Sequence, residues 1–172
     1  TAARILKLTG NALIWQGVKW IPQTTKVLGN YLDYRWTFEL SHLNATVGTI
    51  KGNVYSHWTP CFWYSKNGGI PNRRVRDARD VPLISGANEN HKWHKSVDAL
   101  IYWLDAFTKS GGIVFDPFTG GGTVPAVCKM LGRHYIAFEI DPDTAENARE
   151  RVANTQPPLF ILEPEQMELL AE

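Results

Sequence analysis

The chain has 172 residues, of which 44% are hydrophobic and 20% are charged, with 18 basic and 17 acidic side chains. This balance is typical of one globular domain and excludes the collagen-like, coiled-coil and disordered classes. A net charge of +1 gives no general attraction for nucleic acid, so such a contact would need a local patch. The sequence has no signal peptide and no apolar run that could span a bilayer, so we expect a cytoplasmic protein without a membrane partner.

The first half of the chain mixes helical and strand patterns. Two stretches have less regular patterns: residues 44–55 contain two glycines and are expected to bend, and residues 67–90 have the least ordered composition. In chain order, the other patterns predict the end of a helix at 2–8, a buried strand at 12–16, a helix at 21–32, and strands at 34–40 and 57–66.

From residue 96 onward, predicted helices and strands alternate strictly, which is typical of parallel α/β construction. A glycine-rich turn follows the first strand of this half. The predicted elements are a helix at 96–108, a strand at 113–115, a helix ending at 131, a strand at 135–140, a helix at 144–153 and a short strand at 159–162.

The glycine-rich turn is the most informative segment. Glycines let the backbone approach a ligand closely, and the N-terminus of the following helix offers unpaired amide donors. No lysine follows as a P-loop requires, and the glycine spacing differs from the dinucleotide-binding pattern GxGxxG. The candidate ligand-binding residues here are Asp116, Pro117, Phe118, Thr119, Gly120, Gly122 and Thr123.

Glu139 is a further candidate ligand-binding residue, because a charged residue inside an apolar strand usually has a structural or functional role. It lies sixteen positions after Thr123, in the next predicted strand. In a doubly wound sheet, an acid at that place faces a ligand bound over the first turn and can accept two hydrogen bonds from a ribose diol. Hydrogen bonds to a charged group contribute roughly 1.5 to 3 kcal/mol each.

The cysteines and most tryptophans are interpreted as core residues. Cys61 and Cys128 stand in apolar surroundings without metal-ligand spacing, and nothing else suggests a metal site. For two tryptophans, at 15 and 20, stacking on a nucleobase is the alternative. The tryptophans assigned mainly to the core are Trp15, Trp20, Trp36, Trp58, Trp63 and Trp103.

Three segments together resemble a known family. FDPFTGGGT at 115–123, LGRHYIAFEID at 131–141 and NARERV at 147–152 are similar to the S-adenosylmethionine (SAM) motifs of amino-group DNA methyltransferases. The resemblance implies methyl transfer to adenine N6 or cytosine N4 of double-stranded DNA, with the target base flipped out. It also implies a Rossmann-like α/β fold with a mostly parallel sheet and an antiparallel edge hairpin. In that family the glycine loop holds the methionine half of SAM, and the acid at the position of Glu139 holds the ribose.

The resemblance extends upstream of the glycine loop. HKWHKSV at 91–97 is similar to the family element that packs over the cofactor, which implies cofactor contacts for His91, Trp93 and Lys95. For Trp93 and His91 a purely structural anchor is the alternative. An element of this kind ahead of the glycine loop marks the permuted class, whose catalytic half comes first. We therefore expect one domain over 1–172, with the rest of the catalytic half at 1–66, a DNA-contacting loop at 67–90 and the SAM-binding half at 91–163.

A cluster of basic residues gives the candidate DNA contacts. They lie in the loop at 67–90, where guanidinium groups could bind phosphates and produce a salt-dependent affinity. The alternative is a solvated loop whose charges are partly balanced by Asp77 and Asp80. The four candidates are Arg73, Arg74, Arg76 and Arg79.

The catalytic motif of the family, Asp/Asn/Ser-Pro-Pro-aromatic, is not found in the sequence. The resemblance places it one strand and one helix before Asn11, upstream of Thr1, so we expect a sheet that lacks one central strand. Three alternatives to a self-sufficient DNA methyltransferase stay open. They are half of a split enzyme that needs a partner chain or a homodimer, a SAM- or DNA-binding remnant without catalysis, and an RNA methyltransferase.

Overall fold

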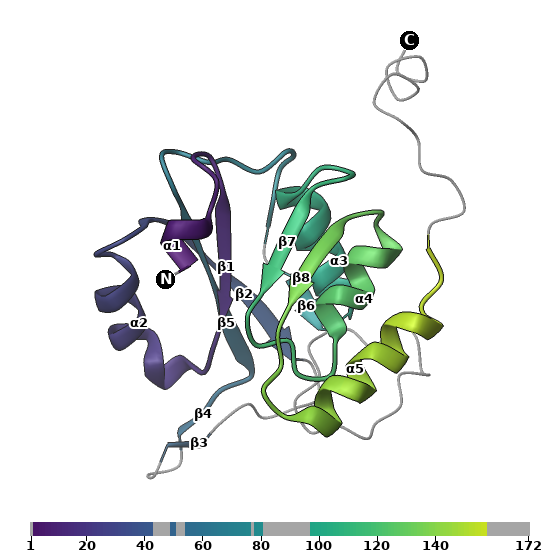
Figure 1. Cartoon of the computed structure of the whole chain (residues 1–172). Helices are drawn as coiled ribbons and strands as arrows, with labels where there is room; N and C mark the ends of the chain where they lie inside the picture. The colour runs from purple at the N-terminus through teal and green to yellow at the C-terminus, as the bar shows by residue number, and fades with distance from the viewer. Residues whose placement is uncertain (1, 43–48, 51–53, 77, 81–96, 158–172) are drawn as a thin grey trace. The chain divides into compact units, whose positions relative to one another are not determined.

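The computed structural model describes residues 2–42, 49–50, 54–76, 78–80 and 97–157. The chain divides into two compact units, Thr1–Ala87 and Asn88–Glu172 (Figure 1). Both mix helices with strands: the first unit contains a largely antiparallel sheet, and the second contains a parallel pair of strands. The predicted mixed α/β class is therefore confirmed. Within the described ranges, no helix is both long enough and apolar enough to cross a bilayer.

The first unit is built on a four-stranded sheet with the order β1-β5-β2-β6. Strand β5 pairs antiparallel with β1 and with β2, and β6 lies parallel to β2. A separate hairpin is formed by β3 and β4. The elements are α1 (Ala2–Ile5), β1 (Asn11–Trp15), η1 (Val18–Trp20), α2 (Ile21–Leu28), β2 (Asp33–His42), β3 (Thr49–Ile50), β4 (Val54–Tyr55), β5 (Trp58–Ser65) and β6 (Ala78–Asp80).

The core of this unit lies where the helices cover the sheet. Phe62 and Tyr64, which share a face of β5, are fully buried together with Leu32. Leu6, from the segment after α1, and Leu28 of α2 pack against this cluster. Ala12 and Ile14 of the predicted strand also pack against this cluster, whereas Ile5 and Leu8 of the predicted N-terminal helix end are exposed.

Three predicted boundaries in the first unit differ from the structure. The helix expected at 21–32 ends at Leu28, with Gly29 as its C-cap, whose amide donates to the Thr25 carbonyl. The loop expected at 67–90 contains strand β6, whose pairing with β2 could not be read from its composition. The bend expected at 44–55 contains the β3–β4 hairpin.

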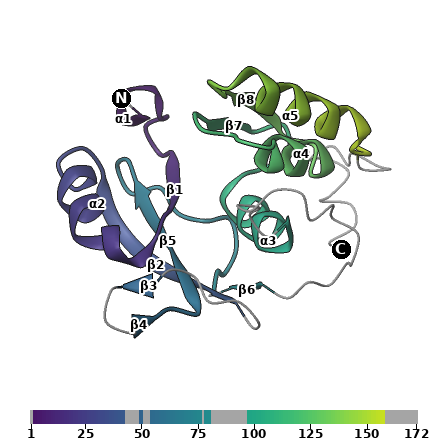
Figure 2. The ribbon, with the colours of Figure 1, turned by 90° about the horizontal axis from the view of Figure 1, so that it is seen from below.

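The second unit alternates helices and strands as the sequence predicts. Strands β7 and β8 are parallel, with Phe115 opposite Ile136. Figures 1 and 2 show α4 between α3 and α5. The elements are α3 (Val97–Phe107), β7 (Ile113–Asp116), α4 (Thr123–Met130), β8 (His134–Ala137) and α5 (Pro142–Asn154).

Two basic side chains tie the elements of this unit together. Arg133, just before β8, donates to Asp105 Oδ1 at 3.0 Å and to the Thr108 carbonyl at 3.0 Å, which fixes the end of α3. Lys129 Nζ donates to the Val152 carbonyl at 2.8 Å, close to the C-terminus of α5. A cation at that end of a helix is favoured by the helix dipole.

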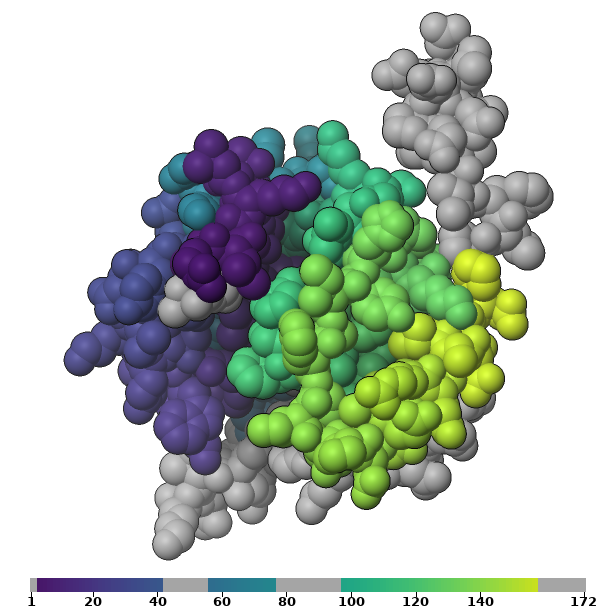
Figure 3. Space-filling model, viewed as in Figure 1, coloured from purple at the N-terminus to yellow at the C-terminus, as the bar shows by residue number. Residues whose placement is uncertain are grey.

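One face of the β7–β8 pair is apolar and open. Ile113, Phe115, Ile136 and Phe138 share this face by strand alternation and register, and His134 is the polar residue among them. Ile113 and Phe138 are each 58% exposed, and the rings of Phe115 and Phe138 meet edge to face at 6.0 Å. Figure 3 shows the β7–β8 segment at the surface. Parallel strands are ordinarily covered on both faces, so this face has room for further polypeptide.

The predicted boundaries of the second unit also need correction. The strand expected at 135–140 ends at Ala137, because the Phe138 carbonyl accepts a hydrogen bond from Thr119 of the glycine loop. The last helix begins at Pro142 rather than at residue 144, and its N-cap is Asp141, which accepts from the Thr144 amide at 2.8 Å. The strand expected at 159–162 lies outside the described residues.

The cysteine and tryptophan predictions have mixed outcomes. Cys61 and Cys128 are both thiols outside any disulfide and are fully buried, as predicted, and burial raises the pKa of the Cys128 thiol to about 12. Trp103 is fully buried, but Trp20 and Trp36 are exposed, so the core prediction is wrong for these two. Trp20 caps α2, and Trp36 follows an irregularity in the register between β2 and β5.

Candidate functional site

The glycine loop leaves β7 at Asp116 and enters α4 at Thr123. Its first turn is held by the Phe118 amide, which donates to Asp116 Oδ1 at 3.2 Å. Its second turn is held by the Gly122 amide, which donates to the Thr119 carbonyl at 3.0 Å. The Thr119 amide bonds the carbonyl of Phe138, just after β8. The loop is therefore attached to both strands.

Two glycines of the loop have left-handed backbone conformations for different reasons. Gly120 has φ +52°, and a Cβ at this position would meet nothing within 4 Å. Gly122 has φ +74°, and a Cβ there would lie only 2.8 Å from Ala148 Cβ of α5. Gly120 thus borders open space that a ligand can enter, whereas Gly122 lets α5 approach the loop.

Glu139 connects the segment after β8 to the loop. Its Oε2 accepts the Gly120 amide at 2.9 Å, and its Oε1 accepts the amides of Ile140 at 2.8 Å and Asp141 at 3.1 Å. These hydrogen bonds, led by that from Asp141, hold the pKa of Glu139 below its ordinary value. The side chain is therefore a carboxylate at neutral pH, as a hydrogen-bond acceptor for a ribose diol would need to be.

Asp116 is a second carboxyl group at the edge of the loop. Burial raises its pKa, and the hydrogen bond from the Phe118 amide opposes that shift. The charge of Glu139 also raises the pKa of Asp116, so the two acids act on each other electrostatically. They give this side of the loop hydrogen-bond acceptors, while the start of α4 provides amide donors.

The N-terminus of α4 has no side-chain cap. Its N-cap is Gly122, which has no side chain to bond the first amides of the helix. The first turn of a helix leaves its amides without intrahelical partners, and they attract negatively charged or hydrogen-bond-accepting groups. In the first turn of α4, Thr123 and Val124 carry amides, whereas Pro125 has none. Open space over Gly120, these two amides and an ionised Glu139 together suit a polar ligand with both donors and acceptors.

The remaining predicted loop residues occupy different environments. Pro117 and Phe118 are exposed, and Phe118 is 89% accessible. Thr123 is buried at the start of α4. His91, Trp93 and Lys95 lie outside the described residues. Within the described ranges, no group of three or more potential metal ligands is found.

The predicted DNA-contacting arginines belong to the first unit. Arg73, Arg74 and Arg76 are exposed in the segment between β5 and β6. Arg79 lies in β6, and its side chain is outside the description. Exposed guanidinium groups are of the kind that contacts phosphates.

Sequence reasoning missed two residues of α5 that contact the loop. Ala148 packs against Gly122, and Arg151 Nη1 donates to Thr123 Oγ1 at 2.9 Å and to the Gly121 carbonyl at 3.3 Å. The two lie three positions apart, so they share one face of the helix. Both belong to the segment 147–152, whose resemblance to a family motif was the available signal.

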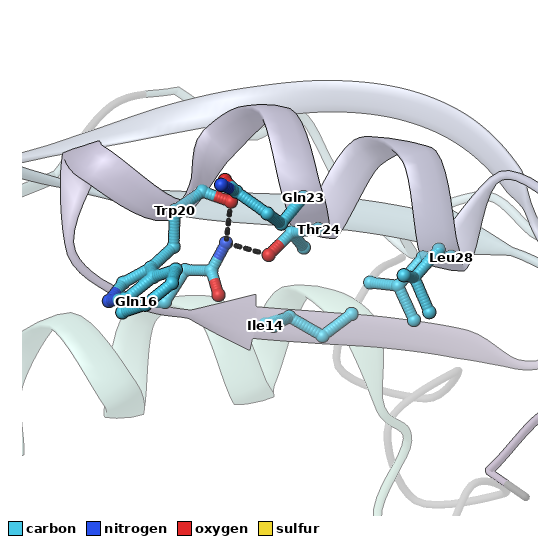
Figure 4. Close-up of a pocket in the computed structure, with 7 residues that line it drawn as sticks. Ile14, Gln16, Trp20, Gln23, Thr24 and Leu28 are labelled. Carbon is cyan, nitrogen blue, oxygen red and sulfur yellow. Dashed lines mark hydrogen bonds between the residues drawn. The ribbon is translucent and has the colours of Figure 1, made fainter.

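A cavity of about 370 Å³ lies in the first unit, between the end of β1 and α2 (Figure 4). Gln16 Nε2 donates to the Trp20 carbonyl at 3.2 Å and to Thr24 Oγ1, which fixes the amide across the cavity. Lys19 Nζ lies 5.0 Å from the centre of the Trp20 ring. The full lining is Ile14, Gln16, Trp20, Gln23, Thr24, Val27 and Leu28.

Comparison with known proteins matches this arrangement to one family. The family model for N6/N4 methyltransferases, described as DNA methylase, matches residues 14–150. The type II methyltransferase M.HpaI of Haemophilus parainfluenzae is 27% identical over 174 residues, which cover 87% of this chain and 55% of that protein. The chain spans about half, or less, of the length of the curated relatives it matches.

Solved structures resemble the chain in fold. The complex of M1.HpyAVI with SAM has a TM-score of 0.74 at 21% identity and covers 87% of this chain and 78% of that one. The cytosine-N4-specific PvuII DNA methyltransferase has a TM-score of 0.69 at 14% identity and covers 96% of this chain and 70% of that one. The predicted Rossmann-like methyltransferase fold is therefore confirmed.

The contact between Gly122 and Ala148 can be tested with a matched pair of substitutions. Gly122→Ala adds both left-handed strain and a clash with α5, so we expect a loss of about 2 to 4 kcal/mol. Gly120→Ala adds strain alone and should cost about 1 to 2 kcal/mol. Equilibrium denaturation in urea measures both.

A rescue variant isolates the clash from the strain. Ala148→Gly makes room for the new methyl group, so its combination with Gly122→Ala should cost less than the sum of the two single changes. Strict additivity, or equal costs at Gly120 and Gly122, would contradict the close approach of α5.

Proposed function

The chain belongs to the family of N6/N4 DNA methylases, and on that premise we propose that it serves the transfer of a methyl group from SAM to an exocyclic amino group of adenine or cytosine in DNA. The observation that carries the proposal is the glycine loop with Glu139 bound to its Gly120 amide. SAM is found in the M1.HpyAVI structure that this fold resembles.

The residues of the second unit fit the parts of SAM. The open backbone at Gly120 and the uncapped start of α4 suit the methionine half, whose carboxylate accepts hydrogen bonds from amides. Glu139 suits the ribose, because its carboxylate is ionised and Oε2 has a lone pair beyond the one used by Gly120. Asp116 adds an acceptor next to the loop. His91, Trp93 and Lys95 are proposed as cofactor contacts on the family resemblance alone.

When bound, SAM supplies a methyl group already activated by its sulfonium, so the protein's task is positioning. The loop and Glu139 are preformed for this task by hydrogen bonds from Gly120, Ile140 and Asp141. Preformed sites lose less conformational entropy when they bind. The target base must be flipped out of its duplex, which costs a few kcal/mol.

The group that guides the target amine is proposed to come from polypeptide outside these 172 residues. The family motif Asp/Asn/Ser-Pro-Pro-aromatic does not occur in the sequence. The apolar face of the β7–β8 pair, with Ile113 and Phe138 more than half exposed, supports a missing strand and helix at this sheet. A second copy of the same residues would lack the motif too, so a homodimer alone would not complete the site.

Two other functions remain candidates. A SAM-binding protein without its own catalysis is favoured by the absent motif. An RNA methyltransferase would use a similar glycine loop on a different substrate. Transfer of a labelled methyl group from SAM to duplex DNA, compared with transfer RNA, distinguishes them. With the protein made from its own gene, together with any partner chain that copurifies, we expect label in DNA; label in RNA alone, or SAM binding without any transfer by that preparation, would refute the proposal.

The source of the missing motif has its own test. The intact mass of the protein made from its own gene, measured on the purified sample, shows whether more polypeptide precedes residue 1. A larger mass with the motif in the added segment gives one complete enzyme. A mass equal to these 172 residues predicts that transfer needs a partner chain, and a preparation that transfers methyl groups without one would contradict this.

Glu139 is predicted to determine SAM affinity. Glu139→Ala removes the proposed ribose acceptor and the partner of the Gly120 amide, so calorimetry should show SAM binding at least tenfold weaker. Glu146→Ala is the matched control, because Glu146 is exposed on α5 and pairs only across the surface with Arg149 at 2.7 Å. Equal affinities of the wild type and Glu139→Ala would refute the ribose assignment.

The exposed arginines are predicted to set the salt dependence of DNA binding. Replacing Arg73, Arg74 and Arg76 together with Ala should reduce the slope of log K against log[salt] by about 3, if each contacts one phosphate. Arg149→Ala serves as a control, because Arg149 is an exposed arginine of α5 that pairs with Glu146. A slope that does not change would show that this segment is only a solvated loop.

A further inference from the structure

Three consecutive residues where the glycine loop enters α4 are contacted by one face of α5. Ala148 lies against Gly122, so close that a Cβ on Gly122 would approach its own Cβ to 2.8 Å. One turn later, Arg151 Nη1 reaches Thr123 Oγ1 at 2.9 Å and the Gly121 carbonyl at 3.3 Å. α5 therefore both packs against this short segment, through Ala148, and forms hydrogen bonds with it, through Arg151.

The hydrogen bond from Arg151 to the Gly121 carbonyl fixes the orientation of one peptide plane. The carbonyl of Gly121 and the amide of Gly122 belong to one planar group. Its carbonyl accepts from Arg151, and its amide donates to the Thr119 carbonyl at 3.0 Å. With both ends bonded, this peptide cannot rotate without breaking a hydrogen bond, although glycine on either side would otherwise allow it.

Electrostatic contributions to this placement oppose one another. A guanidinium near the N-terminus of α4 meets the positive end of that helix dipole, which opposes a cation, whereas the last turn of α5, where Arg151 lies, favours one. Burial disfavours the charged form and lowers the pKa of Arg151. Lys129 also meets the C-terminal end of α5, where its Nζ donates to the Val152 carbonyl at 2.8 Å. Arg151 differs from Lys129 in its two hydrogen bonds to the segment where the loop enters α4.

We propose that Arg151 is a positioning residue for the methyl-donor site. It holds the Gly121–Gly122 peptide and Thr123 in the orientation that meets the methionine half of SAM. The inference rests on the proposed function, and it adds a determinant of affinity that lies on α5 rather than in the loop. Arg151 acts through the loop and not by contact with the reacting groups.

Matched variants separate this role from general stabilisation. Lys129→Ala removes the hydrogen bond from α4 to the Val152 carbonyl of α5 but leaves the contacts of the glycine loop in place. Arg151→Ala removes the tie to the loop, and Arg151→Lys keeps the charge while losing the planar fork that reaches two acceptors. If Arg151→Ala does not fold, Arg151→Lys carries the test alone.

Two readouts are measured on each variant. Amide hydrogen exchange of the SAM-free protein, followed over residues 117–126, should be at least tenfold faster in Arg151→Ala than in wild type and intermediate in Arg151→Lys. Calorimetry should show SAM binding about five- to tenfold weaker in Arg151→Ala, again with Arg151→Lys between. Lys129→Ala should lower the melting temperature while leaving the SAM affinity and exchange over 117–126 near wild type.

The outcomes separate the two hypotheses. Exchange and SAM affinity that stay at wild-type values in both Arg151 variants overturn the inference. Equal weakening by Lys129→Ala and Arg151→Ala also overturns it, because the effect would then be a general loosening of α5. Failure of the wild-type protein itself to bind SAM refutes the proposed function, and the exchange rates still decide whether Arg151 holds the loop.

Discussion

The close approach of α5 to the glycine loop is the constraint on which the second unit depends. Gly122 must lack a side chain, both because its φ is +74° and because Ala148 occupies the space that a Cβ would fill. This contact decides where α4 begins and how near α5 lies to it. β7 leads into the loop, and β8 leads toward α5. The absence of a side chain at Gly122 therefore affects the spacing of β7, α4, β8 and α5.

Around that contact, the loop is held from two directions. From the segment after β8, Glu139 accepts the Gly120 amide, and from α5 Arg151 holds the Gly121 carbonyl. The two side chains have opposite charge and bond opposite kinds of backbone group, so two peptides of the loop, Thr119–Gly120 and Gly121–Gly122, are fixed by different partners. The loop is thus ordered before any ligand arrives, and binding need not supply the free energy for that ordering.

Features that depend on residues close together in the sequence could be predicted from it. Contacts that arise where α5 crosses the glycine loop could not. Alternation of patterns was enough to predict α3, β7, α4, β8 and α5, and a charge within an apolar strand pointed to Glu139. Arg151 was missed because its partner Thr123 is 28 positions away, and only the crossing of α5 over the loop joins them. Trp20 was misassigned because an apolar pattern does not distinguish a helix cap, open to solvent, from the core.

The proposal that a strand carrying the catalytic motif lies outside these residues would also account for the open face of β7–β8. Among the described residues, β7 pairs with β8 alone, which leaves its second edge without a strand partner there. A parallel strand added at that edge would end beside Asp116, because parallel strands bring their carboxyl ends to the same side of the sheet. A motif at its end would then lie next to the loop, and the helix following it would return across the sheet and cover Ile113 and Phe138. The same addition would bury the exposed apolar residues and bring a catalytic group to the methyl donor.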